Sequence, residues 1–289
     1  MGRVRRPTSK NDKERERGMA RLTMEQQQDV AIIRFSNPPH GFMDGETEAE
    51  LAAALDRIEA DDSIHAVILT GGEADVFIRH YDVGILYERG RALADRGMVF
   101  DAARPVPESP IHVCLRRIVE MPKPFIAAIN GTAMGGGFEL ALACDIRLVQ
   151  EGEYDLGLPE INLGILPGAG GTQRLTRLIG EAKALELMLL GQTMRPREAV
   201  RLGLASFLVE GEVMDKALEV ARRLAARSPR AVGHIKDLVR GIPDRSPEEG
   251  FARERTLFCD LMVSERGLQE MGDMVVGRRD ILRTNGEGD

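Results

Sequence analysis

Two carboxylates stand in apolar surroundings, where an ionised side chain is costly unless it is paired or used in chemistry. Glu139 lies in the run FELALACD, and Glu160 lies in LPEINLG. If both faced one cleft, their pKa values would move apart, leaving one carboxyl as a base and the other as an acid. Such a pair suits the addition of water across a double bond. The alternative is that Glu139 complements a helix dipole at the solvent edge and Glu160 is a surface loop carboxylate.

Three consecutive glycines, Gly135 to Gly137, come directly before the apolar helix that carries Glu139. A glycine run lets the backbone approach a ligand closely, and it leaves the first amides of the helix free to donate. Because the helix dipole adds positive potential there, an amide near Gly136 could stabilise a developing oxyanion. The alternative is that these glycines only permit tight packing of the helix on a sheet.

Strands and helices alternate around these residues. Hydrophobic periodicity predicts strands at 29–35, 65–72, 125–131 and 145–150, and helices at about 46–60, 111–120 and from Gly170 or Gly171 onward. The polar stretch from about residue 84 to Pro110 looks like loop and irregular helix, and its length indicates a functional loop or lid. After Glu181 helical patterns dominate, interrupted by one short strand within 203–211. The pattern is typical of an α/β fold.

The bulk composition excludes several classes of protein. The chain has 289 residues, of which 43% are hydrophobic and 29% charged, so it is not a disordered chain. A net charge of −7 favours neither a nucleic-acid partner nor an anionic membrane. No apolar run approaches the length of a membrane span, and three unclustered cysteines suggest neither a disulfide framework nor a metal site. We therefore expect a cytoplasmic protein without membrane or nucleic-acid partners.

The two ends of the chain differ from its middle. Residues 1–21 mix basic and acidic side chains with almost no large apolar ones, which predicts a disordered tail. The acidic residues within that segment argue against a transit peptide. We expect a core at 22–210 and a helical region at 211–289.

Two long motifs resemble one protein family. The segments INGTAMGGGFELALACDIRL and LPEINLGILPGAGGTQRL follow each other as in the enoyl-CoA hydratase/isomerase, or crotonase, superfamily. The similarity extends from about Asp29 to the C-terminal helices. It implies a ClpP/crotonase spiral of ββα units with a helical C-terminal region that assembles into homotrimers, often paired into hexamers. It also implies an acyl-CoA thioester substrate, with no metal and no cofactor beyond the coenzyme A of that substrate.

The resemblance assigns roles to particular residues. Glu139 and Glu160 match the two catalytic glutamates of hydratases, which together hold a water molecule. The oxyanion-hole amides fall on Gly136 and Tyr81. The neighbouring His80, Asp82, Gly135 and Gly168 are expected to contact the substrate.

One loop departs from the family pattern, because residues 78–82 read IRHYD where small residues such as S-A-G-A-D are usual. His80 replaces a glycine and would be strained if its φ had to be positive. Tyr81 could narrow the acyl pocket or place a phenol beside the substrate. His80 is either an additional acid/base group or a loop histidine in solvent. The altered loop keeps open other acyl-CoA reactions, namely isomerisation, decarboxylation and thioester hydrolysis, or a catalytically weak acyl-CoA-binding scaffold.

Overall fold

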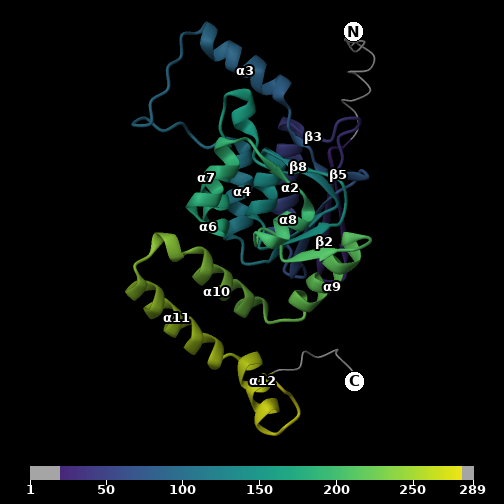
Figure 1. Cartoon of the computed structure of the whole chain (residues 1–289). Helices are drawn as coiled ribbons and strands as arrows, with labels where there is room; N and C mark the ends of the chain where they lie inside the picture. The colour runs from purple at the N-terminus through teal and green to yellow at the C-terminus, as the bar shows by residue number, and fades with distance from the viewer. Residues whose placement is uncertain (1–19, 282–289) are drawn as a thin grey trace.

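The computed structural model describes residues 20–281 of the chain, and a six-stranded sheet runs through its centre (Figure 1). The spatial order is β1 (Leu22–Gln27), β2 (Val30–Phe35), β4 (Ala66–Gly71), β7 (Phe125–Ile129), β9 (Ile146–Gln150) and β12 (Phe207–Val209). The pair β1 and β2 is antiparallel, and the other neighbouring strands are parallel. Parallel strands need crossover connections, and these connections carry the residues of interest.

Short strands that follow the main ones build a second layer. A four-stranded sheet has the order β11 (Thr193–Met194), β10 (Leu156–Gly157), β8 (Gly131–Met134) and β5 (Asp75–Ile78). A two-stranded sheet pairs β3 (Phe42–Met43) with β6 (His80–Tyr81). Because β5 follows β4 and β8 follows β7 along the chain, the repeating unit is two strands and a helix.

Both faces of the main sheet are buried. On one face α2 (Gly45–Ala60), α4 (Pro110–Glu120) and α5 (Gly136–Ala143) share a core with alternate strand residues such as Ala31 and Ile33. On the other face α9 (Val213–Ala225) packs over Val30 and Ile32. Burial on two faces explains why the strands read as continuous apolar runs.

The remaining helices lie around this core. They are α3 (Val83–Asp95), η1 (Glu160–Leu163), α6 (Gly171–Ile179), α7 (Glu181–Leu189), α8 (Pro196–Arg201), α10 (Pro229–Arg240), η2 (Ile242–Asp244), α11 (Pro247–Met262) and α12 (Glu265–Val275). Figure 1 shows α3 standing away from the core at one end, while α11 and α12 extend from the opposite end. No helix within residues 20–281 is long and apolar enough to cross a membrane.

The expected strands and helices of the core are present, with three differences. Seven strands of the described part were not predicted, because β1 is largely exposed and the others, β3, β5, β6, β8, β10 and β11, are only two to four residues long. The segment expected to be loop and irregular helix contains the regular helix α3, although none of its residues is buried. Most of the expected disordered tail, residues 1–21, lies outside the described part. Arg21 at its end is buried and pairs with Asp44 at 3.2 Å.

Candidate active site

A cavity of about 450 Å³ lies between the N-terminus of α5, η1 and the inner face of α3. Its wall brings together seven of the eight site residues named from the sequence: His80, Tyr81, Gly135, Gly136, Glu139, Glu160 and Gly168. Asp82 is the exception. Its carboxylate caps α3 by accepting from the Gly84 amide at 2.7 Å and the Ile85 amide at 3.3 Å, and Asp82 is not part of the lining.

Glu139 sits in the first turn of α5 with only 2% of its surface exposed. Its Oε1 atom accepts hydrogen bonds from the amides of Ala169 and Gly171, both at 2.7 Å. Burial raises the pKa of this carboxyl, while the two amides and the nearby Arg174 guanidinium oppose the rise. The two hydrogen bonds therefore stabilise the ionised carboxylate of Glu139.

The loop that holds Glu139 is itself fixed from two sides. His112 donates from Nε2 to the Gly168 carbonyl at 2.7 Å, and its Nδ1 accepts from the Ser109 amide at 3.1 Å. Arg174 donates from Nη1 to the Ala169 carbonyl at 2.6 Å. Gly168, expected to contact substrate, thus lies in the cavity wall and also serves as an anchor. The amides that bind Glu139 are positioned before any ligand arrives.

Glu160 lies in a different environment. It begins η1, directly after Pro159, and its Oε2 atom is buried without a hydrogen-bond partner among the described residues. Burial raises its pKa to about 7, and the negative charge of Glu139 adds to the rise against one backbone hydrogen bond. A Cβ at Gly135, which has φ of +50°, would lie 3.1 Å from Oε1 of Glu160. The glycine therefore allows this carboxyl to approach the start of α5.

Two backbone amides meet at the start of α5. Glu139 makes the first intrahelical bond, to the Gly135 carbonyl at 2.8 Å, so the Gly136 amide has no acceptor within the helix. A Cβ built at Gly136 would be 3.8 Å from the Tyr81 nitrogen. The amides of Gly136 and Tyr81, named from the sequence as an oxyanion hole, therefore flank the same part of the cavity.

The IRHYD loop reaches this position without backbone strain. Among the described non-glycine residues, only Gln28 and Asp75 have positive φ, so the strain considered at His80 is absent. His80 and Tyr81 instead form β6, which pairs with β3 in parallel. His80 donates from Nδ1 to the Tyr81 carbonyl at 2.7 Å, and its ring stacks on Phe42 with centroids 4.4 Å apart. The histidine is thus a half-buried packing residue in the cavity wall.

The phenol of Tyr81 hydrogen-bonds to Glu48, a carboxyl that the sequence analysis did not single out. Burial and the neighbouring Glu48 raise the pKa of Tyr81 to about 12. Burial also raises the pKa of Glu48, against the hydrogen bond from Tyr81 and the positive charge of Arg89. A signal for Glu48 exists in the sequence, because it occupies an apolar-face position of the helix, three residues before Leu51.

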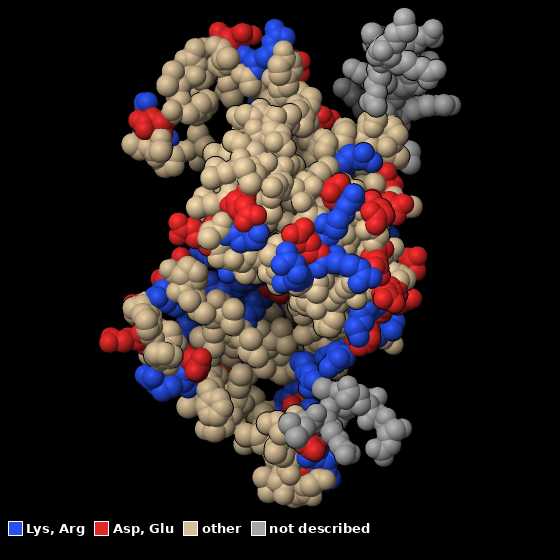
Figure 2. All heavy atoms as spheres, viewed as in Figure 1, with Lys and Arg blue, Asp and Glu red and all other residues tan. Residues whose placement is uncertain are grey.

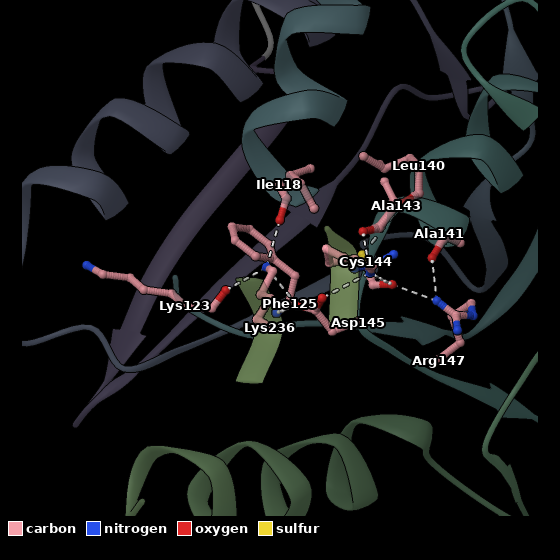
Figure 3. A network of polar contacts seen from close by, with 11 residues as sticks. Ile118, Lys123, Phe125, Leu140, Ala141, Ala143, Cys144, Asp145, Arg147 and Lys236 are labelled. Atoms are coloured by element: carbon pink, nitrogen blue, oxygen red, sulfur yellow. Dashed lines mark hydrogen bonds and ion pairs between the residues drawn. The ribbon is translucent and has the colours of Figure 1, made fainter. Parts of the chain in front are cut away.

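Cations lie around the other end of α5, as Figure 3 shows for Lys236 and Arg147. Arg147 donates to the Cys144 carbonyl at 2.6 Å, and Arg240 donates to the same carbonyl at 3.0 Å. Asp145 forms ion pairs with Lys236 at 2.8 Å and with Arg240 at 2.9 Å, which offsets part of the positive charge. Positive charge at a helix C-terminus complements the dipole whose positive end lies at Gly136.

A second, basic hollow of about 320 Å³ lies behind the Glu139 loop. Its arginines are Arg116, Arg174, Arg177 and Arg240. Figure 2 shows basic side chains gathered between the core and the C-terminal helices. Within residues 20–281, no three His, Cys, Asp or Glu side chains are grouped so that they could hold a metal ion.

Comparison with known proteins gives consistent matches. The family model described as enoyl-CoA hydratase/isomerase matches residues 25–275. A probable enoyl-CoA hydratase of Bacillus subtilis is 36% identical over 253 residues, covering 86% of this chain and 92% of that protein. A short-chain-enoyl-CoA hydratase of Clostridium acetobutylicum is 35% identical, covering 75% and 80%. The crystal structure of an enoyl-CoA hydratase from Bacillus anthracis superposes with a TM-score of 0.78 at 29% identity, covering 89% and 96%.

Proposed function

The chain belongs to the enoyl-CoA hydratase/isomerase family and has the crotonase fold, and from this premise we propose that it adds water to a 2-enoyl-CoA thioester. The observation that carries this proposal is that two carboxyls in one cavity have different hydrogen-bond surroundings. Glu139 receives two amide hydrogen bonds, whereas Glu160 has a buried oxygen without one. Hydration requires one base and one acid, which is the division that these surroundings favour.

The thioester oxygen is proposed to lie between the amides of Gly136 and Tyr81. Attack at the third carbon moves negative charge onto this oxygen, giving an enolate. Two amides held by a helix start and a strand pair need no reorganisation as that charge develops. The phenol of Tyr81 hydrogen-bonds to Glu48, so Tyr81 is proposed to bind the thioester oxygen through its backbone amide.

The two carboxyls then divide the proton transfers. Ionised Glu139 orients the water and helps to remove its proton as the oxygen attacks. Protonated Glu160 donates to the carbon next to the thioester, completing the addition. The pKa of Glu160, near 7, allows the carboxyl to be protonated at neutral pH and still be a competent donor.

The test is a hydration assay with a short and a medium 2-enoyl-CoA, in which the absorbance of the conjugated thioester is followed over time. Wild type, Glu139→Gln and Glu160→Gln are compared. We expect each substitution to lower kcat by about 10²–10⁴-fold, the usual contribution of a positioned acid or base. Circular dichroism spectra that match the wild type control for folding. If both variants keep wild-type rates, the two-glutamate mechanism is wrong.

The same assay separates the other acyl-CoA reactions. Shift of the double bond without uptake of water would indicate an isomerase, and release of free coenzyme A would indicate a thioester hydrolase. Loss of carbon dioxide from a carboxylated acyl-CoA would indicate a decarboxylase. Acyl-CoA binding by calorimetry without turnover of any of these would instead indicate a binding scaffold.

A further inference from the structure

Three polar side chains in the cavity wall take no part in the proposed hydration chemistry. They belong to Glu48, Tyr81 and Arg89. Other polar side chains of the lining that lie outside the proposed hydration chemistry already have partners. His112 and Ser109 bind each other, and Asn162 donates to the Gly191 carbonyl at 3.0 Å. By contrast, Arg89 takes part in no hydrogen bond or ion pair with another residue of the described range 20–281.

The position of Arg89 relative to the thioester follows from α3. Val83, Leu86 and Arg89 line the cavity at every third residue, so they form one face of this helix. The helix begins at Val83, two residues after Tyr81, and six residues at 1.5 Å per residue put the Arg89 backbone about 9 Å further along its axis. Val83 and Leu86 lie between, where the hydrocarbon part of an acyl chain would pass. Arg89 therefore belongs to the far end of the acyl region.

Glu48 and Tyr81 add two polar side chains to a mostly apolar wall. Glu48 is a buried residue of α2, yet its carboxyl forms part of the cavity wall beside the Tyr81 phenol. Glu48 and the Tyr81 phenol bind each other, whereas a plain hydrocarbon that reached Arg89 would give its guanidinium no partner. A guanidinium that makes no hydrogen bond or ion pair with the described residues attracts a negative group, and it matches a carboxylate with two parallel hydrogen bonds.

We infer that the preferred acyl-CoA substrate carries an acidic group, a carboxylate, at the end of its acyl chain remote from the thioester, and that Arg89 binds this group. The inference rests on the proposed function for the position of the thioester. Arg89 is a specificity residue that takes no part in the reaction itself.

The experiment compares two 2-enoyl-CoA substrates of equal chain length, one ending in a carboxylate and one in a methyl group. Wild type is expected to have the higher kcat/KM on the acid-ended substrate. Arg89→Met should lower kcat/KM on that substrate by about 10–100-fold, as expected for a charged hydrogen-bonded pair, and change the other by less than about threefold. Arg89→Lys should retain part of the preference because it keeps the charge.

Arg91→Met is the matched control, since Arg91 lies on the same helix but outside the cavity lining and over the Tyr87 ring at 5.9 Å. It should leave both substrates unaffected. Equal losses on both substrates with Arg89→Met would overturn the inference, because Arg89 would then act on the coenzyme A portion or on folding. A wild type that prefers the methyl-ended substrate would overturn it as well, while leaving hydration intact.

Binding of the two saturated acyl-CoA analogues, measured by calorimetry, tests Arg89 independently of turnover. If wild type hydrates nothing yet binds the acid-ended analogue more tightly than Arg89→Met does, the proposed function fails and the inference stands. If wild type and Arg89→Met bind this analogue with equal affinity, the inference is wrong.

Discussion

Glu139 and Glu160 are the same residue type in one cavity, but their backbone surroundings differ. Two amides from the loop after Gly168 point at Glu139. Glu160 is partly desolvated and feels the charge of Glu139. Burial raises the pKa of both carboxyls, and the amides oppose that rise at Glu139, a difference in surroundings that no residue-by-residue reading of the sequence reveals.

This difference predicts the pH dependence of hydration. Glu160 must be protonated to donate, so kcat/KM should fall about tenfold per pH unit as pH rises through and beyond the pKa of about 7. Glu139 must be ionised, so activity should also fall on the acid side, through a pKa raised above its ordinary value. The measurement is kcat/KM from pH 5 to 9 with a substrate whose acyl chain does not titrate. A rate that stays level from pH 7 to 9 would exclude Glu160 as the acid.

Among the elements, α5 connects the proposed oxyanion hole to the C-terminal region. Its first amides face the cavity, and its last carbonyls accept from Arg147 of β9 and Arg240 of α10. The strand β6 supplies the second amide by pairing with β3. The two amides of the proposed hole are thus held by elements with hydrogen bonds of their own, α5 to Arg147 and Arg240 and β6 to β3.

Replacing Gly136 by proline tests the helix-start donor alone. Proline suits the first position of a helix, and its only chemical loss there is the N–H group. We expect Gly136→Pro to lower kcat by about 10²–10³-fold. Gly136→Ala is the control, because its Cβ would meet Tyr81 atoms at an ordinary 3.5 Å or more and the N–H remains. Equal activity of the two variants would contradict the role of this amide.

Asp145 is the carboxylate that pairs with Lys236 and Arg240 at the C-terminal end of α5, and we call this group of charges the clamp (Figure 3). Asp145→Asn leaves Lys236, which is 8% exposed, as an uncompensated buried cation. We expect the free energy of unfolding in urea to fall by about 3–5 kcal/mol. Glu186→Gln, which breaks the exposed pair with Lys183, should change it by less than about 1 kcal/mol. A similar small loss in both variants would mean that the clamp is not structurally important.

The core strands and the start of α5 could be predicted from the sequence because they depend on local signals, whereas the expectation for Glu160 came from the family resemblance. Apolar runs locate buried strands, and the glycine run before FELALACD marks the helix start. Glu48 and Arg89 were missed because their importance arises from the approach of α2 and α3 to β6, which is a tertiary fact. Asp82 was named for its neighbours, yet its carboxylate is engaged by the cap of α3.

For the whole molecule, the C-terminal helices leave apolar side chains uncovered. Phe251, Phe258 and Met262 share one face of α11, and Phe258 is 64% exposed. An apolar face of this kind is costly in a monomer and typical of a surface that meets another chain. We propose that copies of this chain cover it in a homotrimer or hexamer.

Light scattering after size-exclusion chromatography checks this proposal. Wild type should elute as a trimer or hexamer, and Phe258→Lys should shift the population towards monomer because a charge then enters the apolar contact. Thr256→Lys is the control, since Thr256 is exposed and lies on roughly the opposite side of α11. A monomeric wild type would refute the proposal.

The backbone donor at Tyr81 also bears on how such proteins diverge and are catalogued. A contact made by an N–H group survives almost any change of side chain, so the IRHYD loop could drift far from small residues while its amide stayed beside Gly136. A survey that recognises relatives by the letters of this loop would discard chains that keep the donor. A survey based on the strand pairing of β3 and β6 would retain them.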